Sequence, residues 1–159
     1  MEQILKILQE NALTSPESIG KMLNLGPDQV RESIQALRES GQILAYKAVI
    51  DEALLTEEKV KAIIEVRITP ERGGGFNHLA ERISRFDEVS SCYLMSGGYD
   101  LLVMVEGRSL KEVAAFVSEK LATLGGVLST ATHFHLKSYK EQGVLMLKAE
   151  NEERLPVSP

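Results

Sequence analysis

Hydrophobic residues recur every three or four positions through the first forty residues, which predicts amphipathic helices. The first helix covers about residues 2–11. The second begins at Ser15-Pro16, because serine caps free amides and proline tolerates the first helical position. Pro27 opens a third helix and Gly41 ends it. The three short helices, with a tight turn at 24–26, predict a helix-turn-helix. The expected apolar positions are Ile4, Leu5, Leu8, Ala12, Ile19, Met22, Leu23, Val30, Ile34 and Leu37.

The spacing then changes to alternation over residues 43–50, which predicts a strand that leaves the helical unit. The acidic, irregular stretch 51–59 is typical of a linker. Beyond it, the pattern predicts a strand, a helix, two strands, a helix and a strand. This order is that of a ferredoxin-like domain. The expected bounds are 60–69, 76–86, a hairpin over 89–105, 109–124 with a Ser109/Glu112 capping box, and 127–137.

The two strands of the hairpin are apolar at successive positions, so both faces of the sheet need a cover. Both crossover helices should lie on one face, which leaves the other bare. Pairing of two chains, sheet on sheet, would cover it. Alternation predicts one face with Tyr93, Met95, Leu101, Val103 and Val105, and the opposite face with Cys92, Leu94, Leu102 and Met104.

Composition narrows the class of protein. The chain of 159 residues is 43% hydrophobic, enough for a substantial core, and its net charge of -5 argues against coating nucleic acid or membrane by bulk charge. The single cysteine, Cys92, excludes an intramolecular disulfide and a cysteine-cluster zinc site. No signal-peptide pattern or membrane-spanning apolar run is present. We therefore expect a cytoplasmic protein without a cofactor or metal.

Three motifs, in this order, resemble the Lrp/AsnC family of feast/famine regulators. They are Val30-x-x-x-Ile34-x-x-Leu37-x-x-x-Gly41-x-Ile43-x-x-Tyr46, Gly97-x-Tyr99-Asp100-Leu-Leu, and Gly126-Val127-x-x-Thr130-x-Thr132. The resemblance implies a regulator that binds double-stranded DNA, responds to a small effector such as an amino acid, and forms dimers through the sheet or octamers.

The predicted fold class is thus α+β: an N-terminal helix-turn-helix, winged-helix-like unit linked by a strand to a ferredoxin-like βαββαβ ligand-sensing domain. We expect the helix-turn-helix and its connector over 1–50, a linker over 51–59, the sensing and oligomerisation domain over 60–148, and a disordered tail over 149–159. An apolar piece at 144–147 precedes the tail.

The third helix of a helix-turn-helix enters the major groove, where polar side chains read bases and basic ones hold phosphates. Residues 1–50 carry five basic side chains against six acidic ones, so phosphate anchors are few. An alternative is a scaffold with little DNA affinity. The candidate DNA-binding residues are Gln29, Arg31, Ser33, Gln35 and Arg38.

The turn of the hairpin is the candidate effector site. Asp100 and exposed amides could take an amino acid's ammonium and carboxylate, and the glycines can adopt positive φ. Thr130 and Thr132 share one face of their strand and could join the site. Alternatively, the turn is an ordinary tight hairpin and the threonines merely favour a strand. The candidate residues are Ser96, Gly97, Gly98, Tyr99, Asp100, Thr130 and Thr132.

Two further features have mainly structural interpretations. His133 and His135 share a strand face but have no cysteine or paired carboxylate in their motif, so a metal or haem site is disfavoured. A siroheme decarboxylase-like enzyme or a DNA-free sensor on the same scaffold is the alternative that these histidines leave open. Arg72-Gly73-Gly74-Gly75 could expose amides to an anion but lacks a nucleotide-loop ending, which favours a plain loop.

Overall fold

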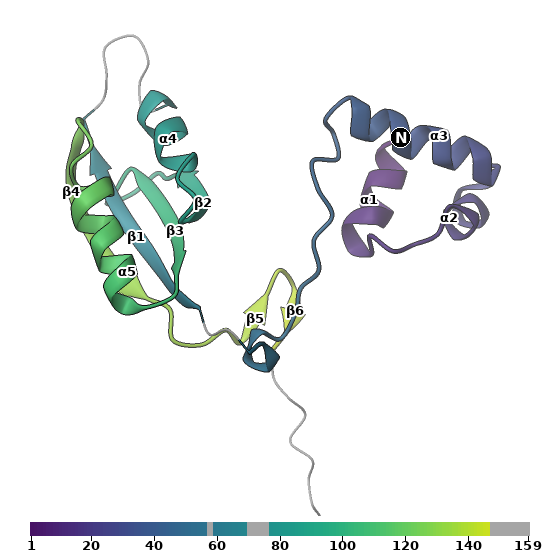
Figure 1. Cartoon of the computed structure of the whole chain (residues 1–159). Helices are drawn as coiled ribbons and strands as arrows, with labels where there is room; N and C mark the ends of the chain where they lie inside the picture. The colour runs from purple at the N-terminus through teal and green to yellow at the C-terminus, as the bar shows by residue number, and fades with distance from the viewer. Residues whose placement is uncertain (57–58, 70–76, 147–159) are drawn as a thin grey trace, which may run out of the picture. The chain divides into compact units, whose positions relative to one another are not determined.

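A computed structural model describes residues 1–56, 59–69 and 77–146 (Figure 1). The chain divides into two compact units, with the boundary between Ile50 and Asp51. The first unit holds three helices, and the second holds a four-stranded sheet with two helices (Figure 1). The predicted fold class, a helix-turn-helix followed by a ferredoxin-like domain, is confirmed.

The helical unit consists of α1 (Glu2–Glu10), α2 (Pro16–Leu23) and α3 (Pro27–Glu39), as the apolar spacing predicts. Two predicted apolar positions do not turn inward: the Ala12 and Met22 side chains are exposed. Ala12 lies beyond the end of α1. Met22 lies beside Leu23, which does contact the core, because two adjacent helical positions differ by about 100° in direction. The buried core residues of this unit are Ile4, Leu8, Ile19, Val30 and Leu37.

Local hydrogen bonds define the helix ends. The Ser15 side chain accepts a hydrogen bond from the Ser18 amide at 3.2 Å, which caps α2. At the end of α3, Gly41 has φ +72°, and the Gln42 amide donates to the Leu37 carbonyl at 2.9 Å. This is a Schellman ending, which favours glycine because the left-handed conformation crowds a Cβ atom.

The strand predicted over residues 43–50 is not formed within this chain: the segment pairs with no strand among the described residues. A strand needs a neighbouring backbone to satisfy its amides and carbonyls, and the described residues offer none to this segment. Most of its apolar side chains are exposed, with Leu44 91% exposed, whereas Ile43 packs against the core of the helical unit. The linker region that follows contains a short 3-10 helix, Glu52–Leu54.

The second unit contains β1 (Val60–Ile68), α4 (Asn77–Ser84), β2 (Val89–Leu94), β3 (Leu101–Gly107), α5 (Leu110–Ala115) and β4 (Val127–Phe134). The strand order is β2-β3-β1-β4 with antiparallel pairing throughout. Helix α5 continues as a π-helical segment, Phe116–Leu121. The Ser109 side chain accepts from the Glu112 amide at 3.1 Å, while the Glu112 carboxylate accepts from the Arg108 amide at 2.6 Å, one residue earlier than in a standard capping box.

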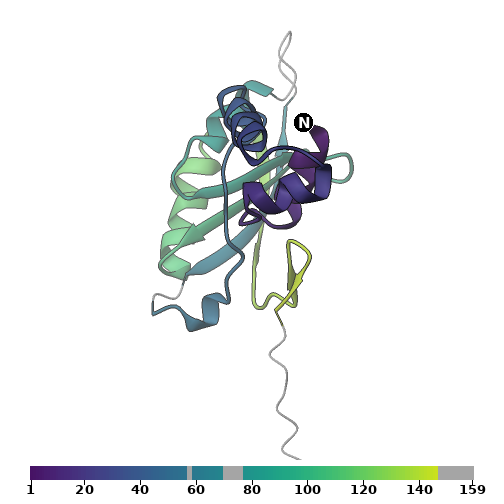
Figure 2. The ribbon, with the colours of Figure 1, turned by 90° about the vertical axis from the view of Figure 1, so that its right-hand side faces the viewer.

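Both helices lie on the same side of the sheet (Figure 2), and the core forms between them and that face. The buried residues of this core are Ala62, Ile64, Val66, Ile68, Leu79, Ile83, Leu101, Val103, Val105, Val113, Phe116 and Leu121. No described helix of this unit packs against the opposite face. We call it the open face; it includes Ile63, Glu65 and Arg67 from β1, Tyr93 from β2, Leu102 and Met104 from β3, and Ala131 and His133 from β4.

The strand register corrects part of the face assignment for the hairpin. Tyr93 pairs with Leu102, so it lies on the open face rather than with the core residues Leu101 and Val103. Cys92 pairs with Val103 and packs against the core. Because residues opposite each other in an antiparallel pair project to the same side, the partner strand decides the face. Alternation along one strand could not decide it, because the phase depends on the turn.

The end of the described chain also differs from the sequence prediction. Strand β4 ends at Phe134 rather than near residue 137. The chain then forms a small hairpin of β5 (Lys140–Glu141) and β6 (Val144–Leu145), whose turn has φ +45° at Gln142 and +88° at Gly143. The predicted tail at 149–159 and the Arg72-to-Gly75 loop lie outside the described residues. Within the part of the chain that is described, no helix has the length and hydropathy to cross a membrane.

Candidate DNA-binding and effector sites

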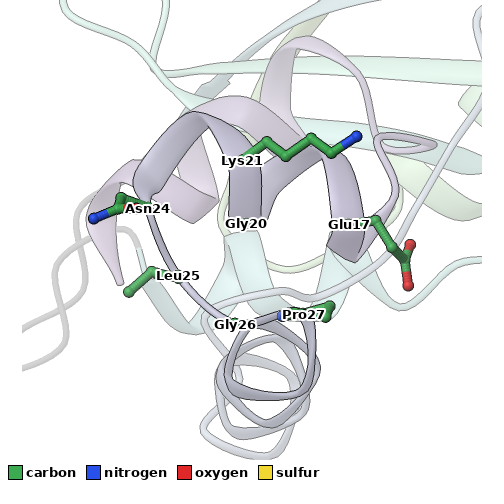
Figure 3. A pocket seen from close by; sticks show the side chains of 7 residues that line it. All are labelled: Glu17, Gly20, Lys21, Asn24, Leu25, Gly26 and Pro27. Atoms are coloured by element: carbon green, nitrogen blue, oxygen red, sulfur yellow. The ribbon is translucent and has the colours of Figure 1, made fainter.

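The turn between α2 and α3 brings the two helices into close contact. Asn24 adopts the left-handed conformation with φ +55°, and the Leu25 amide donates to the Gly20 carbonyl at 2.9 Å. A Cβ atom at Gly20 would lie 2.6 Å from the Leu25 carbonyl oxygen, so only glycine permits this approach. Sequence reasoning missed Gly20, because a glycine inside a helix gives no sign of the backbone that packs against it. The residues beside the turn line a shallow hollow (Figure 3).

The outward surface of α3 is more acidic at its centre than at its edge. Asp28, Glu32, Gln35 and Glu39 follow one another at helical spacing and are all exposed. The two arginines of the helix, Arg31 and Arg38, lie seven positions apart and therefore share one flank of this surface. Positive charge is thus available at the edge of α3, where a groove-bound helix faces the phosphates.

The predicted DNA-binding residues differ in how many hydrogen bonds and ion pairs their side chains already make within the chain. Arg31 donates to Asp28 at 2.6 Å and also to Glu17 of α2. The Ser33 side chain is half-buried and donates to the Gln29 carbonyl at 2.8 Å, while Gln35 donates to Glu39 at 2.8 Å. Arg38 has no hydrogen bond or ion pair from its side chain within the described residues. The two ion pairs of Arg31 are exposed, and exposed pairs of this kind contribute about 0–1 kcal/mol, so a phosphate can displace them.

The tip of the hairpin, residues 96–100, is fastened to the end of β1 by reciprocal hydrogen bonds. The Arg67 Nε atom donates to the Gly98 carbonyl at 2.9 Å, and the Ile68 amide donates to the Asp100 carboxylate at 2.8 Å. The Asp100 amide in turn donates to the Val66 carbonyl at 3.0 Å. The tip is therefore held in one position, although Gly97 and Gly98 do not use the positive φ that glycine allows.

Asp100 has a structural role that the sequence does not reveal. Its carboxylate accepts from the Ile68 amide at the end of β1, directly before β3 begins at Leu101. Only one of its two oxygens makes this bond; the other has no hydrogen bond among the described residues. A carboxylate has about four acceptor positions, so the second oxygen remains available to a cationic ligand.

Thr130 and Thr132 do share a strand face, but the structure does not bring them against the tip. They pair with Val66 and Ile64, whose side chains are buried under the helices. Strand β1 lies between β4 and the tip, which separates Thr130 from Asp100 by two interstrand spacings, about 10 Å. The tip and the two threonines are therefore separate candidate groups within one chain.

Arg67 is the charged side chain that the structure adds to the tip. It is exposed, projects on the open face and contacts a residue 31 positions away in the sequence. Alternation along β1 places it on the same face as Glu65, but nothing in the sequence places it beside Gly98. It therefore becomes a candidate only through the pairing of β1 with β3.

The two histidines occupy different surroundings. His133 lies on the open face, and its Nε2 atom is 3.4 Å from Glu65. His135 Nε2 lies 3.1 Å from the Ser138 hydroxyl. Among the described residues, no three histidine, cysteine or carboxylate side chains gather as a metal site would require.

Comparison with known proteins places these features in a family. The family model for the Lrp/AsnC ligand binding domain matches residues 61–145. An HTH-type transcriptional regulator of Bacillus subtilis, YugG, is 46% identical over 158 residues, which cover 99% of this chain and 95% of the relative. The leucine-responsive regulatory protein of Haemophilus influenzae is 27% identical, with 92% and 87% of the two chains covered.

Solved structures share the fold. An AsnC family transcriptional regulator from Agrobacterium tumefaciens has a TM-score of 0.66 at 25% identity, covering 88% of this chain and 90% of its own. A transcriptional regulator from Neisseria meningitidis, solved in complex with L-methionine, has a TM-score of 0.68 at 24% identity, with 89% and 91% covered. The family resemblance inferred from the three motifs is confirmed: the chain belongs to the Lrp/AsnC family.

Proposed function

We propose that this protein is a DNA-binding transcriptional regulator whose operator binding responds to a small effector, an amino acid, and whose copies pair through the open face. The observation that carries the proposal is the match along almost the whole chain to a helix-turn-helix regulator at 46% identity. A match of that extent includes both the helix-turn-helix and the ligand-binding domain, in the same order. The other curated relative described above, the leucine-responsive regulatory protein of Haemophilus influenzae, is also named as a regulator.

The third helix supplies two kinds of DNA contact in this proposal. Arg31 and Arg38 on its flank hold phosphates, and the amide side chains of Gln29 and Gln35 reach base edges, where such groups pair with adenine. Ser33 is half-buried and bonded to its own helix, so it contributes least. The acidic centre of the helix keeps the charge contribution per chain small, which makes pairing of two chains important for affinity.

The open face supports pairing of two copies. Ile63, Leu102 and Met104 form an apolar centre that no described helix of the second unit covers, and Tyr93 beside them is 51% exposed. Charged side chains flank this centre, including Glu65 and Arg67. A two-fold axis through such a face sets each apolar residue against an equivalent one, which is how homodimers bury a self-complementary surface.

The experiment that tests the proposal begins with genomic DNA fragments captured by the purified protein, with and without each common L-amino acid. Sequencing of the captured fragments gives the operator, and the amino acid that changes the captured set is the effector. Fluorescence anisotropy on that operator then measures affinity against salt concentration. Capture of fragments without preference, or failure to capture any, would contradict the regulator function.

The double substitution Arg31→Ala/Arg38→Ala should weaken operator binding and flatten its salt dependence. Each lost phosphate contact lowers the slope of log K against log salt by about 0.9, so a dimer that loses four contacts should show a slope smaller by about 3 to 4. The matched control is Arg82→Ala/Arg85→Ala, which removes the same charge from α4 and the residue after it in the other unit and should leave the slope unchanged. Equal slopes of log K against log salt for both double variants would show that α3 is not part of the DNA interface.

A further inference from the structure

The two arginines of α3 have different surroundings. Arg31 is held from two sides: its Nη1 atom donates to the Asp28 carboxylate at 2.6 Å, and its Nη2 atom donates to the Glu17 carboxylate. Arg38 is exposed and has no ion pair within the part of the chain that the structure describes. Carboxylates of the protein itself therefore neutralise one of the two positive charges on the flank of α3.

Glu17 is the partner of Arg31 that comes from another helix. It lies in the first turn of α2, whereas Asp28 lies one turn before Arg31 on α3 itself. Positions three apart on a helix are neighbours in any sequence, so the Asp28 contact follows from local geometry. The Glu17 contact joins residues 14 positions apart and depends on the packing of α2 against α3. The tertiary structure thus places Glu17 on a guanidinium that the helix-turn-helix offers to DNA.

The fold of the helical unit does not depend on this ion pair. The side chains of Arg31 and Glu17 are 51% and 52% exposed, and exposed pairs contribute little to folding. The buried residues Ile19, Val30 and Leu37 hold the helices together. The main effect of the pair is therefore on the charge that α3 presents to a ligand.

Glu17 also has a second basic neighbour. Lys21 follows it by four positions on α2, the order in which glutamate and lysine attract each other on a helix. Both residues line the hollow beside the turn (Figure 3), yet no ion pair joins them among the described residues. When another anion binds Arg31, Lys21 remains as a local partner for Glu17. This second partner lowers the free-energy cost of releasing Arg31.

A DNA phosphate and a glutamate carboxylate compete for the same donors, because both accept hydrogen bonds from the terminal nitrogens of a guanidinium. We propose that Glu17 is an internal competitor of DNA for Arg31, so that it weakens DNA binding at every sequence. This inference rests on the proposed function, because it takes Arg31 as a phosphate contact. Phosphate contacts carry no sequence information, so the competitor lowers operator affinity and non-specific affinity by the same factor.

Fluorescence anisotropy of the full-length protein tests the competition on two duplexes, the captured operator and a shuffled version of it. Glu17→Gln keeps the size of the side chain and removes its charge. We expect the affinity of a dimer to rise by about twofold to twentyfold, since one exposed ion pair shifts an equilibrium by up to about fivefold and two chains contribute. The ratio of the operator affinity to the shuffled-duplex affinity should stay the same.

A double-mutant cycle separates competition from a general effect of charge. Glu10→Gln is the matched control, because it removes an equal charge from an exposed position at the end of α1. In an Arg31→Ala background no guanidinium is left to compete for, so Glu17→Gln should strengthen binding there no more than Glu10→Gln does. An equal gain from Glu17→Gln with and without Arg31 would overturn the inference, because it would show an effect of charge alone.

Two further results would contradict the competition. Weaker DNA binding by Glu17→Gln, or a changed ratio between the operator and the shuffled duplex, would show that Glu17 positions Arg31 for DNA. Urea unfolding of Glu17→Gln should match that of the wild type closely, which excludes a loss of folding as the cause.

The outcomes also separate this inference from the proposed function. An operator that wild type and Glu17→Gln bind with equal affinity would overturn the competition and leave the regulator intact. If the wild type captures no DNA, the regulator function fails and the inference fails with it.

Discussion

At the scale of a single residue, the absence of a Cβ atom at Gly20 allows the close approach of α2 to the turn before α3. The position looks like an ordinary, slightly unfavourable helical glycine, since glycine weakens a helix by about 1 kcal/mol relative to alanine. In the folded unit, however, it lies against the Leu25 carbonyl, and this contact sets how closely α2 approaches the turn before α3. The position of the predicted recognition helix therefore depends on a residue that contacts no DNA.

Gly20→Ala should destabilise the helical unit by about 1 to 3 kcal/mol, because the new Cβ atom would force the backbone at Leu25 to move. Urea unfolding of the full chain, followed by the helical circular dichroism signal, measures the change. Gly26→Ser is the matched control in the same turn. A Cβ atom at Gly26 meets nothing within 4 Å, and serine is favoured at a helix N-cap, so this variant should be at least as stable as the wild type.

At the scale of elements, the π-helical segment after α5 is fastened to the start of β2. Lys120 donates to Glu88 and lies 5.9 Å from the centre of the Phe86 ring, while Phe86 and Phe116 pack edge to face at 5.5 Å. The sequence pattern predicts one continuous helix here and gives no sign of the wider turn. Within this one π-helical segment, Phe116 packs into the core and Lys120 lies at the edge of the sheet.

The Lys120–Glu88 bond should make stability depend on acidity. The hydrogen bond from Lys120 lowers the pKa of Glu88 below its ordinary value of 4.5, although partial burial opposes this. A carboxyl pKa that is depressed on folding contributes stability that is complete above the unfolded-state pKa and is lost as pH falls through the folded-state pKa. Glu88→Gln should therefore have a lower Tm than the wild type at pH 7, and the difference should disappear in acid.

Thermal unfolding from pH 7 to below pH 4 measures this difference. Glu119→Gln removes the same charge from an exposed position on the same segment and should follow the wild-type curve more closely. A constant Tm difference between Glu88→Gln and the wild type across the whole range would show that the contact acts by packing and not by charge.

At the scale of the whole molecule, the sheet of the second unit has one face that helices cover and one face, the open face, that no described helix of the unit covers. The helices bury the middle of one side of the sheet, where Ile64, Val66, Leu101 and Val103 are fully inaccessible. The open face alternates with these residues along the same strands and remains apolar at its centre. The described helices of this unit do not cover it, and the proposed pairing of two copies would supply a cover.

Ile63→Glu should weaken this pairing. Ile63 pairs with Met104 on one side and His133 on the other, so a carboxylate there would be buried at the centre of the proposed interface on both chains. We expect a dimer dissociation constant at least about a hundredfold higher, measured by sedimentation equilibrium. Ala114→Glu adds the same charge to an exposed position on α5 and should not change association. Equal dissociation constants for the two variants would exclude the open face as the interface.

The sequence alone determined the elements of this protein and their order. Helical spacing identified α1, α2 and α3, and the Pro27 and Gly41 boundaries followed from local backbone chemistry that no distant residue alters. Alternation identified β1 and the hairpin for the same reason. The motifs that span these elements were specific enough to indicate the family, which the comparisons confirmed. The Ser96-to-Asp100 tip also came from the sequence, because glycine-rich turns between apolar strands are local features.

Only the tertiary structure decided the relations between distant segments. Strand register placed Tyr93 on the open face and Thr130 a full strand away from the tip. The segment 43–50 pairs with no strand among the described residues. The same pairing brought Arg67 to Gly98 and gave Asp100 a backbone partner. Periodicity records which face of its own element a residue occupies. It does not record which other element lies beside that face, because that depends on the free energy of packing the whole domain.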